Sequence, residues 1–122
     1  MSAPHPIEGL WQPIRAELSG ESAPPMVLER MTLTLRSGRY AVHFGGEISD
    51  QGSFTHASGD PHATLTLSGE KGANAGRSIP AIFQLVGDRL RICYGLDGAL
   101  PSAFVTTSAS RFYLVTYRRT SA

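Results

Sequence analysis

The sequence predicts one all-β domain, a single up-and-down antiparallel β-barrel of about eight to ten strands. Apolar and polar residues alternate with a period of two over most of the chain, as in strands with one buried face. Helical spacing is rare, and 13 glycines and 8 prolines interrupt the chain. Gly9-Leu10-Trp11 near the start and Arg118-Arg119 near the end are placed as expected if the first and last strands are neighbours in a closed barrel.

The first half of the chain contains clear strand and turn signals. A first strand is expected at roughly 8–18, where Pro13 predicts an edge or a bulge because proline cannot donate to a ladder. Segments 31–36 and 39–44 alternate on either side of Ser37-Gly38, which predicts a hairpin with a two-residue turn. A short helical turn near 24–30 is expected to cover one opening of the barrel.

Similar patterns continue to the end of the chain. Further strands are expected at 48–56, 63–68, 79–86, 90–94, 103–107 and 111–118. The glycine-rich segment 69–78 is expected to be an exposed, mobile loop. We expect residues 1–122 to form a single domain, with loose tails at 1–6 and 119–122.

Charge and cysteine content exclude several classes of function. Eleven Lys and Arg against ten Asp and Glu give a net charge of +1, which is too small a field to attract nucleic acid. No stretch approaches the ~18 apolar residues of a membrane span. Cys93 is the only cysteine, so no internal disulfide forms, and the start of the chain has no signal-peptide pattern. These features favour the cytoplasm, although a longer precursor that loses its signal peptide would leave the same sequence.

Several short motifs occur in a fixed order along nearly the whole chain. They are E-G-L-W at 8–11, L-x-G at 18–20, G-R-Y-A-V-H-F-G-G at 38–46, D-Q-G-S-F-T at 50–55, Asp60-Pro61, A-I-F-Q-L-V-G-D-R-L-R-I-C-Y at 81–94, D-G-x-x-P-x-x-F at 97–104 and Y-R-R at 117–119. Together they resemble a bacterial family of small lipocalin-like domains. The resemblance implies a lipocalin-like, calycin-like barrel and no particular activity. The chain departs from the family at Leu100, where arginine is usual, and at Phe83, where tyrosine is common.

Trp11 is expected to close one end of the barrel. Tryptophan buries a large area, and an arginine from the last strand can cap its face through a cation–π contact. We assign Gly9, Trp11 and Arg118 to this structural plug. Arg119 has the opposite strand parity and should face the other way, so the choice between the two arginines depends on a register that the sequence leaves open.

The barrel interior is the expected ligand-binding site. The residues of inward parity are Met31, Leu33, Leu35, Tyr40, Val42, Phe44, Leu65, Leu67, Phe83, Leu90, Ile92, Tyr94 and Phe104, with Phe112 and Leu114 on the last strand. Barrels of about eight strands are either filled by their own side chains or hold one small ligand. Large aromatic residues favour filling, whereas Met31 and the hydroxyl groups of Tyr40 and Tyr94 suit an apolar ligand held by one or two hydrogen bonds.

No catalytic, metal-binding or cofactor-binding motif stands out, so we expect no metal and no cofactor. Cys93 is expected to pack as a small apolar residue, although Arg91 nearby could lower the pKa of its thiol. His43, His56 and His62 lie on different predicted strands without the spacing of metal ligands, and are expected to be solvated.

Three functions follow, and the first is preferred. The barrel would bind a small, mostly apolar molecule, without catalysis, at the end away from the plug. A filled interior would instead favour a protein-interaction module that uses loops 69–78 and 95–101. The third is a small enzyme with Tyr40, Tyr94 or His43 as acid or base at the barrel mouth, which convergence with a carboxylate on one cavity would support.

Overall fold

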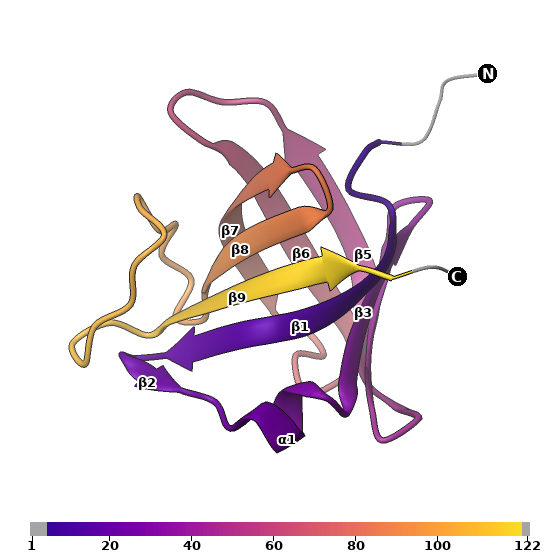
Figure 1. Ribbon diagram of the computed structural model, residues 1–122. Coiled ribbons are helices and arrows are strands. Elements are labelled where there is room, and N and C mark those ends of the chain that lie inside the picture. Colours follow the sequence, from indigo (N-terminus) through magenta and orange to yellow (C-terminus); the bar gives the residue numbers. More distant parts are fainter. Residues whose placement is uncertain (1–4, 121–122) are drawn as a thin grey trace.

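The computed structural model, which describes residues 5–120, shows a closed antiparallel β-barrel (Figure 1). Its elements are β1 (Gly9–Leu18), β2 (Glu21–Ser22), α1 (Pro25–Leu28), β3 (Met31–Arg36), β4 (Arg39–Phe44), β5 (Glu47–Ala57), β6 (Ala63–Gly72), β7 (Ser78–Val86), β8 (Arg89–Gly95) and β9 (Phe112–Arg119). From β3 to β9 each strand pairs with the next, and β9 pairs with β1 to close the barrel. The predicted fold class, an all-β up-and-down barrel of lipocalin-like architecture, is confirmed.

The β3–β4 hairpin has the predicted two-residue turn. Arg36 pairs with Arg39, and the two residues between them, Ser37 and Gly38, have φ of 52° and 75°. Positive φ at both central positions is characteristic of a type I′ turn, whose twist matches the right-handed twist of the paired strands. The alternation on either side of this turn therefore predicted the register of β3 and β4 correctly.

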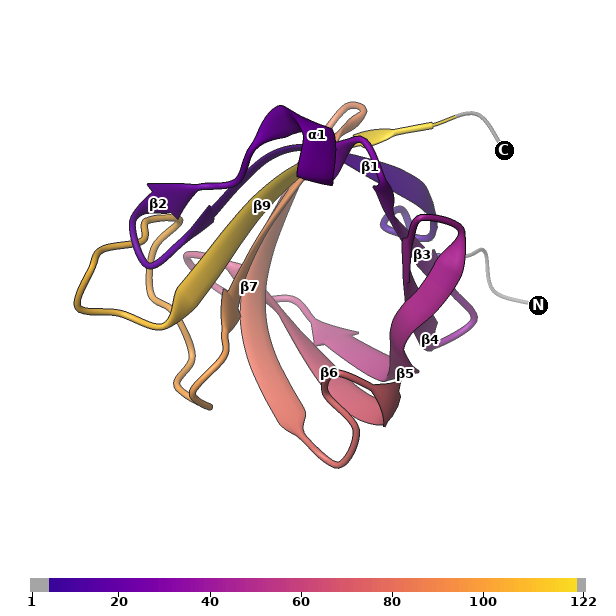
Figure 2. The ribbon, with the colours of Figure 1, turned by 90° about the horizontal axis from the view of Figure 1, so that it is seen from below.

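β1 contains the irregularity that Pro13 predicts. The register between β1 and β9 shifts between Pro13 and Arg15. β1 pairs with β3 only from Gly9 to Trp11. Beyond Trp11, the segment around α1 forms hydrogen bonds with the edge of β1 that β3 leaves unpaired. There the side-chain amide of Gln12 donates to the carbonyl of Leu28 at 2.6 Å. Figure 2 shows α1 at the edge of the barrel wall, so the predicted helical turn exists but does not cover the opening.

The predicted strand at 103–107 is wrong. Residues 96–111 form a long connection between β8 and β9, which projects from the barrel in Figure 1. Phe104 packs on the outside of the barrel, where the Cζ atom of Arg91 lies 4.2 Å from its ring centroid and the His62 ring lies 4.8 Å away. The prediction that Phe104 lines the interior is therefore also wrong, because this segment belongs to no strand of the wall.

The last strand has the opposite parity to the predicted one. Val115 faces the interior, where it is buried opposite Ile92 and Ala16. The inward residues of β9 are thus the odd-numbered ones, and Phe112 and Leu114 lie on the outer face. Both faces of this strand carry apolar residues, so alternation alone could not show which face is inside.

Trp11 and Arg119 close one end of the barrel. They are direct partners between β1 and β9, and the Cζ atom of Arg119 lies 4.3 Å from the indole ring. The guanidinium also donates to the carbonyls of Glu8 at 2.8 Å and Pro6 at 2.5 Å. The indole N–H donates to the carbonyl of Ile7 at 2.8 Å, and no part of the Trp11 side chain reaches solvent. The N-terminal segment is thereby folded across this end of the barrel.

The assignment of Arg118 to this plug is wrong, because Arg118 has the outward parity and is exposed. Gly9 does belong to the plug. A Cβ atom there would lie 2.6 Å from Nη1 of Arg119, and the φ of Gly9 is +146°, so only glycine leaves room for the guanidinium.

Residues 5, 6, 119 and 120, which were predicted to belong to loose tails, make defined contacts. Pro6 and Arg119 are joined by the hydrogen bond just described, and the backbone N–H of Thr120 donates to the carbonyl of Leu10 at 2.9 Å. The imidazole of His5 lies against that of His56, with ring centroids 4.0 Å apart. The remaining tail residues, 1–4 and 121–122, lie outside the described residues.

Replacing Arg119 by alanine should lower the free energy of unfolding by about 1–2 kcal/mol, because the variant loses the contact with the indole and two hydrogen bonds to carbonyls. Arg118→Ala is the matched control, since it removes the same side chain from the exposed neighbouring position, and its effect should stay within about 0.5 kcal/mol. Urea unfolding of both variants measures the difference. Equal losses would contradict the assignment of Arg119 to the plug.

Candidate ligand-binding site

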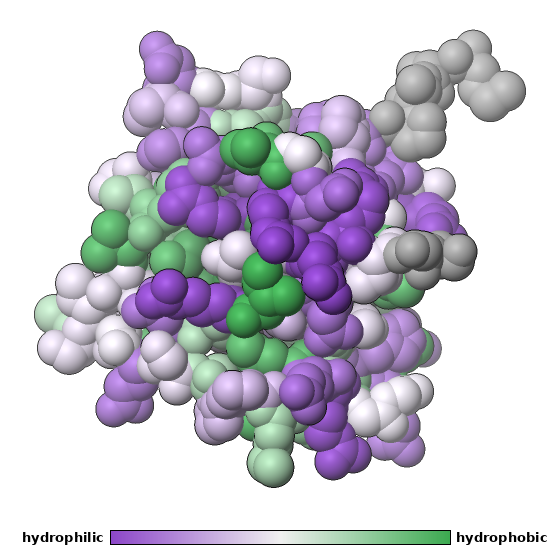
Figure 3. Space-filling model, in the orientation of Figure 1, coloured by the Kyte–Doolittle hydropathy of each residue, from purple (hydrophilic) through white to green (hydrophobic). Residues whose placement is uncertain are grey.

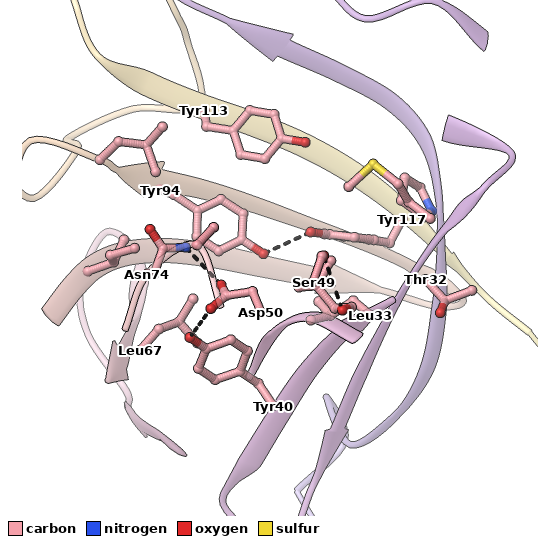
Figure 4. A pocket seen from close by; sticks show the side chains of 16 residues that line it. Thr32, Leu33, Tyr40, Ser49, Asp50, Leu67, Asn74, Tyr94, Tyr113 and Tyr117 are labelled. Atoms are coloured by element: carbon pink, nitrogen blue, oxygen red, sulfur yellow. Dashed lines mark hydrogen bonds between the residues drawn. The ribbon is translucent and has the colours of Figure 1, made fainter. Parts of the chain in front are cut away.

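The end of the barrel away from Trp11 is hollow. A cavity of about 200 Å³ opens there between the strands (Figure 4). Its lining comprises Pro13, Met31, Thr32, Leu33, Tyr40, Val42, Ser49, Asp50, Leu67, Ala73, Asn74, Ile79, Leu96, Tyr94, Tyr113 and Tyr117. All four tyrosines of the chain belong to this lining.

The predicted interior residues fall into three groups. Those that line the cavity are Met31, Leu33, Tyr40, Val42, Leu67 and Tyr94. Those that are buried but fill the core instead are Leu35, Leu65, Phe83, Leu90 and Ile92. The third group, Phe44 and Phe104, lies outside the barrel interior. Phe44 is the last residue of β4 before the Gly45-Gly46 turn and is 42% exposed, with the guanidinium of Arg30 5.6 Å from its ring centroid.

The polar centre of the site is Asp50 on β5, which was not predicted from the sequence. Its side chain is only 7% exposed. Asp50 lies on the same inward face of β5 as Phe54, which is also buried, so the parity of Phe54 was a signal that could have found it. Asp50, Gly52 and Phe54 alternate without interruption, but the register shift against β4 falls just before Asp50, where the extra residue Ser49 ends the regular pattern toward the start of β5.

Two neutral donors hold the carboxylate of Asp50. The hydroxyl of Tyr40 donates to Oδ1 at 3.1 Å, and the side-chain amide of Asn74 donates to Oδ2 at 2.7 Å. Figure 4 shows the carboxylate between these two side chains, facing Tyr94 and Tyr117. Burial raises the pKa of Tyr40, and the charge of Asp50 and its hydrogen bond raise it further. The phenol therefore stays protonated at neutral pH and acts as a donor.

The turn that carries Asn74 is well defined. The segment 69–78 was predicted to be an exposed, mobile loop, and most of it is exposed, but β6 extends to Gly72 and β7 begins at Ser78. The N–H of Gly69 donates to the carbonyl of Arg77 at 2.9 Å. A Cβ atom at Gly69 would overlap the backbone carbonyl of Asn74. The absence of a side chain at Gly69 thus lets the turn fold back over β6 and bring Asn74 to Asp50.

The other three tyrosines form an aromatic wall. The hydroxyls of Tyr94 and Tyr117 are hydrogen-bonded at 2.8 Å, and the Tyr113 ring stacks on Tyr94 with centroids 5.7 Å apart. Burial raises the pKa of all three phenols, so none of them is ionised near neutral pH. The wall offers ring faces and hydroxyl groups to a ligand, and no charge.

The histidines do not gather at this cavity. His43 lies on the outward face of β4, His56 contacts His5, and His62 packs against Phe104. Within residues 5–120 no three His, Cys, Asp or Glu side chains are grouped so as to hold a metal ion.

Cys93 lies outside the barrel interior as well. It is opposite Ile82 and Leu114 on the outer face of β8, and it is fully buried. Burial raises the pKa of its thiol, and a backbone hydrogen bond with Val105 opposes this only in part. The alternative in which Arg91 lowers this pKa is therefore wrong, because desolvation dominates.

Iodoacetamide should alkylate Cys93 in the folded protein on the order of 100-fold more slowly than in denaturant at the same pH, because the thiol is both buried and protonated. Mass spectrometry of timed samples gives the two rates. Similar rates would mean that the connection 96–111 does not cover the thiol.

Fold and site together define a small up-and-down β-barrel that is filled at one end and hollow at the other. No protein-family model matches the chain, and no curated protein or solved structure shows significant similarity to it. In the described part of the chain, no helix is long and apolar enough to span a membrane. The resemblance to the lipocalin-like family thus stays a prediction. The cavity is the feature of the structure that bears on function.

Proposed function

We propose that the protein binds one small, mostly apolar molecule in the open end of the barrel and does not transform it. The observation that carries this proposal is the contrast between the two ends. Leu35, Leu90 and Ile92 are fully buried and do not line the cavity, whereas the end away from Trp11 keeps a cavity with mainly apolar walls. Small ligands bind in such concave apolar sites, where a few polar groups fix their orientation.

The size of the cavity limits the ligand. An apolar cavity of about 150 Å³ accommodates benzene. A cavity of about 200 Å³ therefore suits a molecule with a single ring and a short substituent. Fatty acids, retinoids and haem are too large to enter completely.

Native mass spectrometry of gently purified protein, followed by thermal-shift titration with compact neutral aromatics such as benzyl alcohol and indole, tests the proposal. A co-purifying mass or a saturable rise in melting temperature supports it. Val42→Phe, which fills the cavity, should abolish the shift, and Ala41→Phe, on the outward face of the same strand, should keep it. Absence of binding in the wild type by neutral and charged compact aromatics alike, or equal binding by the two variants, would refute the proposal.

A protein-interaction module is less well supported, because a filled interior would have favoured it, whereas this barrel contains a cavity. The exposed large apolar residues, moreover, are distributed over different elements. They are Ile14, Leu18, Met26, Phe44, Ile48, Val86, Leu100 and Val105. On the face drawn in Figure 3, apolar patches are small and separated by polar residues.

An acid–base enzyme remains a second candidate, because Tyr40 and Asp50 do converge on the cavity. Against it, the raised pKa of Tyr40 keeps the phenol protonated at neutral pH, so no phenolate is available as a base, and the hydroxyl already donates to Asp50. His43, another expected base, does not line the cavity. Recovery of bound ligand with an unchanged mass after long incubation supports binding alone, whereas a new product mass that disappears in Asp50→Asn supports catalysis.

A further inference from the structure

Asp50 is a buried carboxylate that no cation neutralises within the described residues. The salt bridge found within the described residues joins Arg39 to Glu70, and it lies on the surface. Arg77, on the turn beside Asp50, donates instead to the side-chain oxygen of Asn74 and to the carbonyl of Leu96. Buried carboxylates are normally paired with a positive group, because removing a charge from water is costly.

The cavity has an uneven distribution of charge. Sixteen described residues line the cavity, and Asp50 is the only one of them with a charged side chain. Tyr40 and Asn74 occupy one acceptor position on each carboxylate oxygen. An ionised carboxylate has about four such positions, so further donors can bind from the cavity side.

The aromatic wall suits the same kind of ligand. Four tyrosine rings surround the space in front of Asp50 (Figure 4). The face of an aromatic ring attracts a cation within about 6 Å of its centroid, and the attraction strengthens away from water. The charge of Asp50 also contributes to the raised pKa of Tyr94, as expected if its field crosses the cavity.

From this juxtaposition we infer that the ligand is a small organic ammonium ion, with its nitrogen at Asp50 and its apolar body among the tyrosines. This inference rests on the proposed function and specifies the class of ligand. A metal ion fits the site less well, because Asp50 is the one His, Cys, Asp or Glu residue in the cavity lining and no group of three such side chains occurs within residues 5–120.

Three probes of nearly equal shape test the inference at neutral pH: benzylammonium, benzyl alcohol and benzoate. Isothermal titration calorimetry on the wild-type protein should show benzylammonium binding at least about tenfold more tightly than benzyl alcohol, and benzoate binding most weakly. This comparison needs no variant, so it remains valid even where a substitution impairs folding.

Asp50→Asn then locates the source of the preference. This variant keeps the shape of the side chain, and its ratio of affinities for benzylammonium and benzyl alcohol should fall to about one. Glu47→Gln is the matched control, because it removes a carboxylate from an exposed position on the same strand, and it should leave the ratio unchanged.

The outcomes separate the two proposals. Binding of benzyl alcohol without a preference for benzylammonium overturns the ammonium inference and leaves the proposed function intact. Binding of neither probe refutes the proposed function together with the inference. A preference that persists in a folded Asp50→Asn variant, or disappears in Glu47→Gln, overturns the assignment to Asp50.

Discussion

Replacing Trp11 by alanine lowers the free energy of unfolding by about 3–5 kcal/mol, the cost of deleting a large buried aromatic side chain. Trp11 is fully buried, packs beneath Arg119 and donates a hydrogen bond to Ile7. The variant leaves a void at the closed end and a guanidinium without its aromatic partner. Since small domains are stable by only about 5–15 kcal/mol, this loss is a large share of the total.

Urea unfolding followed by far-UV circular dichroism measures the effect. Trp11→Phe is a useful control, because it keeps a ring beneath Arg119 and loses only the indole N–H and part of the volume, so it should cost less than Trp11→Ala. A loss below about 1 kcal/mol in Trp11→Ala would contradict the view that the indole closes the barrel.

Gly69→Ala should lower the free energy of unfolding by about 2–3 kcal/mol, because the added methyl group would overlap the backbone carbonyl of Asn74. Backbone cannot move aside as a flexible side chain does. Any relief of the overlap must lift the turn from β6 and take the Asn74 amide away from Asp50. The variant should therefore also change the chemical shifts of the Asn74 side-chain amide.

Gly76→Ala in the same turn is the matched control. A Cβ atom at Gly76 meets nothing within 4 Å, although its φ of +80° disfavours alanine. It should cost about 1 kcal/mol, from the backbone conformation alone, and leave the Asn74 amide in place. Equal losses in the two variants would mean that the close approach of Asn74 to Gly69 is unimportant.

The strands and their hairpins were predictable because alternation is a local signal. Turn residues such as Ser37-Gly38 set the register of β3 against β4, and Pro13 marked the irregularity in β1. The alternation together with the rarity of helical spacing predicted an all-β fold. Each of these features depends on a few residues that are close together in the sequence.

Features that depend on distant parts of the chain were predicted poorly. Arg119 could be distinguished from Arg118 only through the pairing of β9 with β1, which are more than 90 residues apart in sequence. Segment 103–107 has the composition of a strand, yet it packs on the outside, where Phe104 meets Arg91 and His62.

The candidate site was predicted only in its apolar part. Alternation identified Leu33, Val42 and Leu67, which line the cavity. The polar centre depends on Asp50, between two register shifts, and on Asn74, which reaches it from a turn. A search for buried apolar residues overlooks a buried carboxylate, since aspartate is usually found in turns and on the surface.

The contrast between the filled and hollow ends has a consequence for how such a protein can change during evolution. Leu35, Leu90 and Ile92 belong to the buried core and do not line the cavity, and Met31, Thr32 and Ser49 line the cavity without belonging to that core. Substitutions at lining positions outside the core can alter the preferred ligand while the core stays intact, so the usual conflict between stability and new specificity is reduced there. One barrel of this design can give rise to descendants that share the closed end and differ in the molecules they hold.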